Sequence, residues 1–272
     1  MSLLADFHNH SCLSPCGSLD LSPRALAELA AGRGVKVLAL TDHNSSLNCP
    51  AFAKVCPPRG ILPLFGMEAT TQEEIHFLCL FTSLEACMDF NEYAYNILLP
   101  FPNDPEKTGD QVYVDEDDNI EGEVEYYLIN PIDLTADTIG PKVSEYGGIV
   151  IPAHVERPAF SMMSQLGVIV EGPWAALEFT RLPPVSSSPL INSSWWGVNS
   201  PDNCRQEVDA LCYPLITSSD AHYPEHVARR PFELDICMEQ LAPDGLSGKA
   251  DMGALIEALA KRVTNNTMRN QE

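Results

Sequence analysis

The chain has 272 residues, of which 45% are hydrophobic and 20% are charged. This composition is typical of a globular protein with a large buried core, and it excludes a disordered chain. The 38 acidic residues outnumber the 16 basic ones and give a formal net charge of −22, so the summed field of the protein repels polyanions. We therefore do not expect long nucleic acid to be a partner.

The sequence indicates neither membrane insertion nor export. Its longest apolar runs are far shorter than the roughly 20 residues that a membrane-spanning helix needs, and no basic segment followed by a long apolar run begins the chain. The nine cysteines are odd in number and include no Cys-x-x-Cys pair, which favours free or metal-bound thiols over a disulfide framework. We expect a cytoplasmic location, while the oligomeric state is unknown from the sequence.

Strands and helices alternate in the first part of the chain. In chain order, the sequence predicts a strand at 3–7, a helix at 22–34, strands at 35–41, 60–71 and 74–81, and a helix at 83–98. The first helix has Ser22 as its N-cap, Pro23 at its first position and Gly34 as a stop signal.

An acidic segment then interrupts this alternation. Residues 100–130 contain two alternating runs on either side of a turn signal at Asp117, Asp118 and Asn119, which predicts a hairpin. We interpret the chain as one domain, residues 1–272, with a surface insert at about 84–132.

The alternation resumes after this insert. The sequence predicts a helix at 138–146, strands at 148–154, 175–180 and 212–222, and a closing helix at 251–262. Seven strands that alternate with helices predict an α/β fold with a parallel sheet, either a barrel or a wound sheet.

Candidate metal ligands lie at the predicted strand ends. In a parallel barrel the C-terminal ends of the strands form one face, so side chains that are distant in sequence converge there. The candidates at such ends are His8, His10, His43, Glu68, His154, Asp220 and His222. His76 lies near the start of its strand and fits this pattern less well.

The spacing of these candidates favours a metal cluster. Side chains alternate along an extended chain, so His8 and His10 point to the same side, and so do Asp220 and His222. Imidazole and carboxylate ligands suit zinc, iron or manganese, and a carboxylate such as Glu68 can bridge two ions.

These motifs closely resemble those of the PHP family, named for polymerase and histidinol phosphatase. The matching pieces are DFHNHS, LALTDHN, GMEAT, IHFLCLF, IPAHVERP and SSDAHY, in the family's order. The resemblance implies a distorted (β/α)7 barrel, similar to a TIM barrel, with two to three divalent ions at the C-terminal ends of its strands. The implied ligands are His8, His10, Glu68 and Asp220 for one ion, His43 and His222 for a second, and Glu68, His76 and His154 for a third.

The loop after His10 departs from the family's pattern. Many PHP proteins have an Asp or His there that binds the second ion, whereas the segment SCLSPCG has Pro15 and Cys16. Either Cys16 coordinates as a thiolate, which favours zinc or iron, or His43, His222 and water complete this site. Alternatively, Cys16 is a small buried thiol that packs beneath the loop.

The expected reaction is hydrolysis of a phosphate ester. Water bound to such ions has a pKa lowered toward ~7 and supplies hydroxide, and paired ions hold the attacking and leaving oxygens. The expected substrate is a small phosphomonoester or a nucleotide. Arg157 is the candidate for binding phosphate oxygens, and His226 is a weaker candidate for phosphate contact or leaving-group protonation.

Two alternatives to this function remain open. A TIM-barrel amidohydrolase also begins with His-x-His and ends with an Asp on a late strand, but it usually bridges its metals with a modified lysine or a carboxylate in mid-barrel. Here no lysine lies at a predicted strand end. The second alternative is a regulatory module that binds metal and has lost catalysis.

Overall fold

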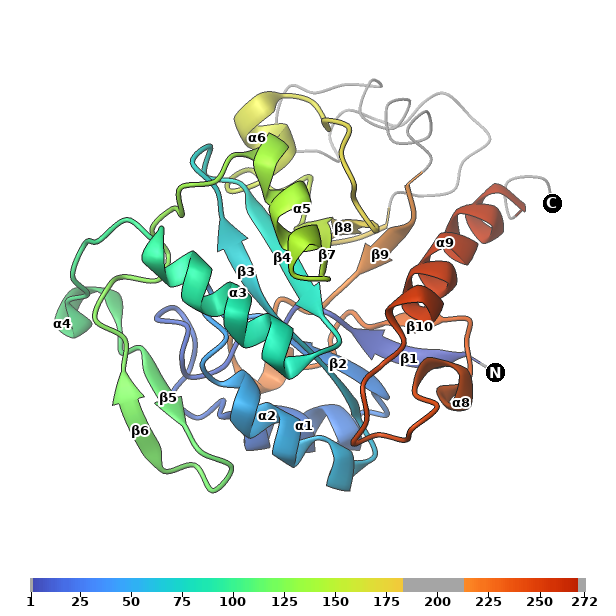
Figure 1. Ribbon diagram of the computed structural model, residues 1–272, viewed down its shortest axis with the longest axis horizontal. Helices are drawn as coiled ribbons and strands as arrows, with labels where there is room; N and C mark the ends of the chain where they lie inside the picture. The colour runs from blue at the N-terminus through green and yellow to red at the C-terminus, as the bar shows by residue number, and fades with distance from the viewer. Residues whose placement is uncertain (1, 183–212, 269–272) are drawn as a thin grey trace.

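Seven strands curl into a distorted barrel in the computed structural model, which describes residues 2–182 and 213–268; the first five belong to one sheet, and the last two pair with each other (Figure 1). The strands are β1 (Leu3–Asp6), β2 (Val37–Leu40), β3 (Leu62–Thr70), β4 (His76–Phe81), β7 (Ile149–Pro152), β8 (Leu177–Phe179) and β9 (Leu215–Thr217). They correspond to the seven strands predicted from the sequence, which confirms the α/β barrel architecture.

One strand runs against the predicted direction. β1, β2 and β3 pair in parallel, but β3 and β4 form an antiparallel hairpin in which Thr70 lies opposite His76. The prediction of a parallel sheet is wrong for β4, because a short turn at 71–75 replaces the crossover that parallel neighbours need. β10 (Phe232–Leu234), which the sequence did not predict, adds an antiparallel edge beside β1.

Single backbone contacts complete the barrel. Val150 of β7 forms a parallel bridge with Trp174, which lies just before β8, and β8 pairs in parallel with β9. After β9, the backbone N–H of Asp220 donates to the carbonyl oxygen of His8 at 2.8 Å. The chain segments after β1 and β9, which carry several candidate ligands, are thereby held side by side.

Helices pack against both faces of the sheet. The helices are α1 (Pro23–Gly32), α2 (Cys49–Val55), α3 (Leu84–Asn96), α4 (Pro105–Thr108), α5 (Ala136–Glu145), α6 (Met162–Leu166), α8 (Met238–Leu241) and α9 (Met252–Met268), with short 3-10 helices η1 (Pro57–Arg59) and η3 (Pro224–His226). One buried cluster joins the sheet to α1, α2, α3 and α5, and a second joins its other face to α8 and α9. The Ser22 hydroxyl accepts a hydrogen bond from the Ala25 N–H, as its N-cap position predicts.

The acidic segment forms the predicted hairpin. β5 (Val112–Val114) and β6 (Ile120–Glu123) pair antiparallel, and the turn between them contains Asp118 with a φ of 66°. The hairpin is tied to the loop after β2, because the Val114 N–H donates to Asn48 Oδ1 at 2.8 Å. Figure 1 shows it as a projection beside α2 and α4.

Within the described part of the chain, no helix combines the length and the apolar character that crossing a membrane requires.

Candidate metal centre

Eight side chains meet at one end of the barrel. They lie at the C-terminal ends of β1, β2, β3, β7 and β9 and at the first position of β4, which begins beside the end of β3 because the two strands are antiparallel. We call them the ligand cluster: His8, His10, His43, Glu68, His76, His154, Asp220 and His222. Six are buried, while Asp220 and His222 are half-buried. The structure therefore brings together all the predicted histidine and carboxylate ligands, His76 included.

Glu68 lies at the centre of the ligand cluster. Its Oε1 lies 2.7 Å from His76 Nδ1 and 3.0 Å from His154 Nε2. Its Oε2 lies 3.1 Å from His43 Nδ1 and 3.3 Å from His10 Nε2. Burial acts to raise the pKa of this carboxyl, but the surrounding imidazoles outweigh burial and hold the pKa well below its usual range. Glu68 is therefore ionised and can bridge two cations.

Asp220 contacts further side chains at the more exposed side of the cluster. Its Oδ1 lies 3.4 Å from His10 Nε2 and 3.3 Å from His222 Nδ1. Its Oδ2 accepts a hydrogen bond from Arg157 Nη1 at 2.9 Å. The Arg157 side chain is 40% exposed, so the guanidinium lies between the cluster and solvent.

Four sets of three side chains place their ligand atoms within 4.8 Å of one another. The sets are His8, His10 and Asp220; His8, Glu68 and His154; His43, Glu68 and His76; and His10, His43 and His222. The resemblance placed Glu68, His76 and His154 on one ion, whereas these sets separate His76 from His154. Because the sets share members, one continuous cluster offers room for more than one cation.

The ring orientations of His8 and His10 suit cation binding through Nε2. The two Nε2 atoms are 3.2 Å apart and face the cluster. On the other side of each ring, the Nδ1–H of His8 donates to Glu178 at 3.0 Å and that of His10 donates to Ser14 Oγ at 3.0 Å. With both Nδ1 protons held outside, the Nε2 lone pairs are the ones available to an ion.

Unpaired ring nitrogens support the same conclusion. His43 Nδ1, His76 Nε2 and His154 Nδ1 are buried and make no hydrogen bond within the described residues, although His43 Nδ1 lies 3.1 Å from Glu68 Oε2. Buried polar atoms are nearly always paired in native proteins, so these ring nitrogens are suited to bind an ion. Imidazole nitrogens and carboxylate oxygens are ligands of zinc, manganese and iron, and the side chains present fit divalent ions of this kind.

In the absence of an ion, the pKa values divide the imidazoles into two classes. Burial acts to lower the pKa of His10, but hydrogen bonds to Asp220 and Glu68 outweigh it and raise the pKa to about 9. Facing carboxylates likewise raise the pKa of buried His8 well above its ordinary value. Burial, together with the charge of His10, lowers the pKa of His222 to about 3. Protons therefore lie on His8 and His10 until a cation displaces them.

The backbone is strained at the ligand cluster. His154 has a φ of 31° and Asp220 a φ of 48°, and Asn44, which follows His43, has a φ of 44°. Left-handed conformations of this kind cost ~1–3 kcal/mol each in residues other than glycine, and they persist where the surrounding structure fixes them. Such strain is typical of functional sites.

Two buried carboxylates behind the cluster were not predicted. Asp42 accepts a hydrogen bond from Ser14 Oγ at 2.7 Å, and Ser14 is the partner of His10. Glu178 is the partner of His8. The sequence did contain a signal for Glu178, since an acidic residue in the middle of the apolar strand AALEFT needs a buried partner.

Cys16 and His226 lie outside the cluster. Cys16 is exposed, so the interpretation of it as a buried thiol is wrong, and it belongs to none of the four ligand sets found among the described residues. The His226 ring packs edge-on against Tyr223 with the ring centroids 5.4 Å apart. No hydrogen bond or ion pair joins His226 to the cluster in residues 2–182 and 213–268.

The fold and the cluster define a class of α/β barrels that bind metal ions at the ends of their strands. A family model described as the PHP domain matches residues 6–130, so this part of the chain is similar to that family. The matched region includes five of the eight cluster residues, and His154, Asp220 and His222 lie beyond it. The resemblance inferred from the motifs is thus confirmed. A comparison with curated proteins found no match.

Solved structures share this fold. The lesion-specific endonuclease PfuEndoQ from Pyrococcus furiosus aligns with a TM-score of 0.60 and 15% identity, over 96% of this chain and 56% of its own. A complex of endonuclease Q with a 27-mer duplex containing an abasic lesion has the same score and identity, over 96% and 57%. A protein from Bifidobacterium adolescentis, assigned as a metal-dependent phosphoesterase, aligns with a TM-score of 0.51 and 16% identity, over 94% and 96%.

These likenesses concern the fold, because the identities are low. The chain spans only 56–57% of the length of the endonuclease Q chains. The expected enzyme class, a hydrolase of phosphate esters, agrees with the match to the PHP-domain model.

Proposed function

We propose that the chain is a metal-dependent phosphoesterase that hydrolyses a small phosphomonoester or a nucleotide, such as a nucleoside phosphate, a 3',5'-bisphosphate or a short oligonucleotide. The observation that carries this proposal is the ligand cluster, in which four ligand sets overlap through shared histidines and two of them contain Glu68. Two to three zinc, manganese or iron ions bound there would polarise a phosphate ester and lower the pKa of bound water toward ~7.

The position of Arg157 supports a phosphate-binding role. One of its nitrogens is fixed by Asp220, and the side chain is exposed enough for its other N–H groups to meet a ligand. A guanidinium can bind two phosphate oxygens at once and compensate the charge that develops on them. His226, at the side of Tyr223, stays the weaker candidate for protonating the leaving group.

The charge distribution favours a compact substrate. Three divalent ions would bring six positive charges, of which Glu68 and Asp220 neutralise two, inside a molecule with a net charge of −22. A small phosphorylated molecule is attracted to such a local positive site, whereas a long polyanion is repelled by the rest of the surface.

Duplex DNA is the second candidate substrate, because a structure with the same fold holds a 27-mer duplex. The 16 basic residues of this chain leave few cations for phosphate contacts along a duplex, which favours the small substrate.

A comparison of substrates tests the proposal. Protein loaded with Mn²⁺, and separately with Zn²⁺ or Fe²⁺, is given a chromogenic phosphomonoester, nucleoside monophosphates, a 3',5'-bisphosphate, and a duplex with an abasic site. We expect phosphate release from one or more of the small esters and no nicking of the duplex. Nicking without phosphate release would identify an endonuclease, and metal-loaded protein that is inactive on every substrate would identify a regulatory module.

A further inference from the structure

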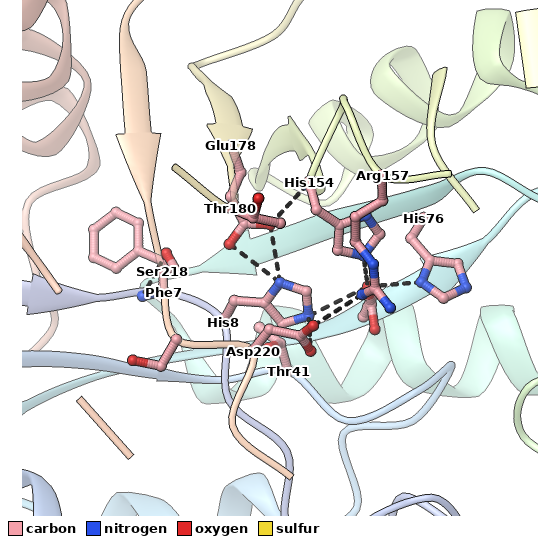
Figure 2. A network of polar contacts seen from close by, with 12 residues as sticks. Phe7, His8, Thr41, His76, His154, Arg157, Glu178, Thr180, Ser218 and Asp220 are labelled. Carbon is pink, nitrogen blue, oxygen red and sulfur yellow. Dashed lines mark hydrogen bonds and ion pairs between the residues drawn. The ribbon is translucent and has the colours of Figure 1, made fainter. Parts of the chain in front are cut away.

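Glu178 is a buried carboxylate next to the ligand cluster that belongs to none of its four ligand sets. It lies in the middle of β8, and 3% of its side chain is exposed. Figure 2 shows it between His8 and His154, with dashed lines to both residues. Its Oε2 accepts hydrogen bonds from the Nδ1–H of His8 at 3.0 Å and from the backbone N–H of His154 at 2.9 Å.

The two residues that Glu178 holds belong to one ligand set. His8, Glu68 and His154 place their ligand atoms within 4.8 Å of one another, and Glu178 contacts His8 and His154 from outside that set. The contact with His8 uses Nδ1, which is the ring nitrogen opposite the Nε2 that faces Glu68. Glu178 therefore cannot bind the same ion as His8 Nε2. It can affect that ion only by holding the ligands His8 and His154.

Each contact fixes a different degree of freedom. The carboxylate can only accept from His8, so it keeps the proton on Nδ1, leaves Nε2 as the ligand atom, and makes the ring a stronger donor to a metal. At His154 it holds the N–H of a residue whose φ of 31° is strained. Without that hydrogen bond, the backbone is free to relax and to carry the imidazole away from Glu68.

We propose that Glu178 is a positioning residue that couples His8 and His154 as ligands of one ion. This inference rests on the proposed metal binding and adds to it a residue that does not touch the ion. It predicts that loss of the Glu178 carboxylate weakens one metal site and leaves the rest of the cluster able to bind.

Glu178→Gln is the first test, because the amide keeps the size of the side chain and loses the charge and one acceptor oxygen. Glu156→Gln is the matched control. Glu156 is a partly buried carboxylate two residues after His154, and it accepts hydrogen bonds from the N–H and the hydroxyl of Thr180 instead of from a cluster residue. Mn²⁺ binding is measured by titration calorimetry and by metal content after dialysis, and folding by circular dichroism and thermal unfolding.

We expect Glu178→Gln to lower the affinity for one of the bound Mn²⁺ ions by ~10- to 100-fold, which is the range found when a partner of a metal ligand is removed. Glu156→Gln should bind Mn²⁺ with the affinity of the wild type. The absorption spectrum of bound Co²⁺ should change in Glu178→Gln and not in the control, because a ligand of that ion is displaced. Glu178→Asp keeps the charge and shortens the reach, so a positioning role predicts that it too binds weakly.

Wild-type affinity and an unchanged Co²⁺ spectrum in Glu178→Gln would overturn the inference. If Glu178→Gln does not fold, Glu178→Asp decides: wild-type binding in that variant overturns the positioning role, and weakened binding in a folded protein supports it. Failure of the wild type to bind any ion would instead contradict the proposed function, so the two outcomes are distinguishable.

Discussion

Glu68 Oε1 lies 2.7 Å from His76 Nδ1, although the two residues are on strands that run in opposite directions. The short turn of the β3–β4 hairpin places the first residue of β4 opposite Thr70, next to the end of β3. β4 therefore contributes a ligand from its first residue, whereas the parallel strands contribute ligands from their C-terminal ends. All of these ligands lie at the same end of the barrel.

Glu68→Gln should reduce the metal content of the protein more than any other single change. Glu68 lies within 3.3 Å of five imidazoles, so its carboxylate serves several ligand sets at once. We expect the metal affinity to fall by more than the ~10- to 100-fold loss that follows removal of a hydrogen-bond partner of a ligand. Metal analysis after dialysis checks this, with exposed Glu74→Gln on the same hairpin as control. Equal metal content in both variants would contradict the central place of Glu68.

His8→Ala and Asp220→Ala should abolish hydrolysis and leave the protein folded. Both residues belong to one ligand set, so their loss should remove metal before it affects the core, which lies away from the cluster between the sheet and the helices. Turnover of a phosphate ester and circular dichroism are measured on the same samples. Turnover comparable to the wild type in either variant at saturating metal would refute the assignment.

Arg157→Lys should lower kcat/KM without lowering metal content. The lysine keeps the charge but loses the planar fork, and a lost hydrogen bond to a charged group corresponds to ~1 to 3 kcal/mol in catalytic efficiency. Steady-state kinetics with a phosphate ester, together with metal analysis, test this. If Arg157→Ala leaves the kinetics unchanged, the residue serves only to pair with Asp220.

Metal affinity should rise with pH up to about 9. The pKa of His10 is raised to about 9 and that of His8 is raised well above its ordinary value, so both rings hold protons at neutral pH that an incoming cation has to displace. The His10 proton competes with the ion below about pH 9, and the His8 proton competes until its own raised pKa is passed. Calorimetry of Mn²⁺ binding in buffers of different ionisation enthalpy counts the released protons, and release of none at pH 7 would contradict these protonation states.

Cys16→Ser should leave metal content and activity unchanged, because Cys16 is exposed and lies outside the four ligand sets of the described residues. His43 and His222 would then share their ion with His10, the third member of their ligand set. Loss of one ion per chain in this variant, measured against the wild type, would instead identify a thiolate ligand.

Much of the ligand cluster could be predicted because each motif combines a buried strand with the polar residue that follows it. His8, His43 and Asp220 follow β1, β2 and β9, and strand ends meet on one face of a barrel. Hydrophobic periodicity reveals a strand but not its direction, so the place of His76 beside Glu68 came only from the family resemblance.

Residues behind the ligands could not be found from the sequence in the same way. The apolar strand around Glu178 marks it as a buried carboxylate, but the contacts of Glu178 with His8 and of Asp42 with Ser14 join residues that are distant along the chain, and no local pattern identifies such partners. The exposed position of Cys16 is also a tertiary property, since a cysteine in a loop is consistent with burial, exposure or metal binding.

The central claim is that the ligand cluster holds the ions that hydrolyse a phosphate ester. The most direct measurement titrates metal-stripped protein with Mn²⁺ and follows bound ions and phosphate release in the same samples. Two to three ions should bind per chain, hydrolysis should appear as they bind, and a chelator should abolish hydrolysis until Mn²⁺ is restored. Full occupancy without turnover, for Mn²⁺ and equally for Zn²⁺ and Fe²⁺, would contradict this claim.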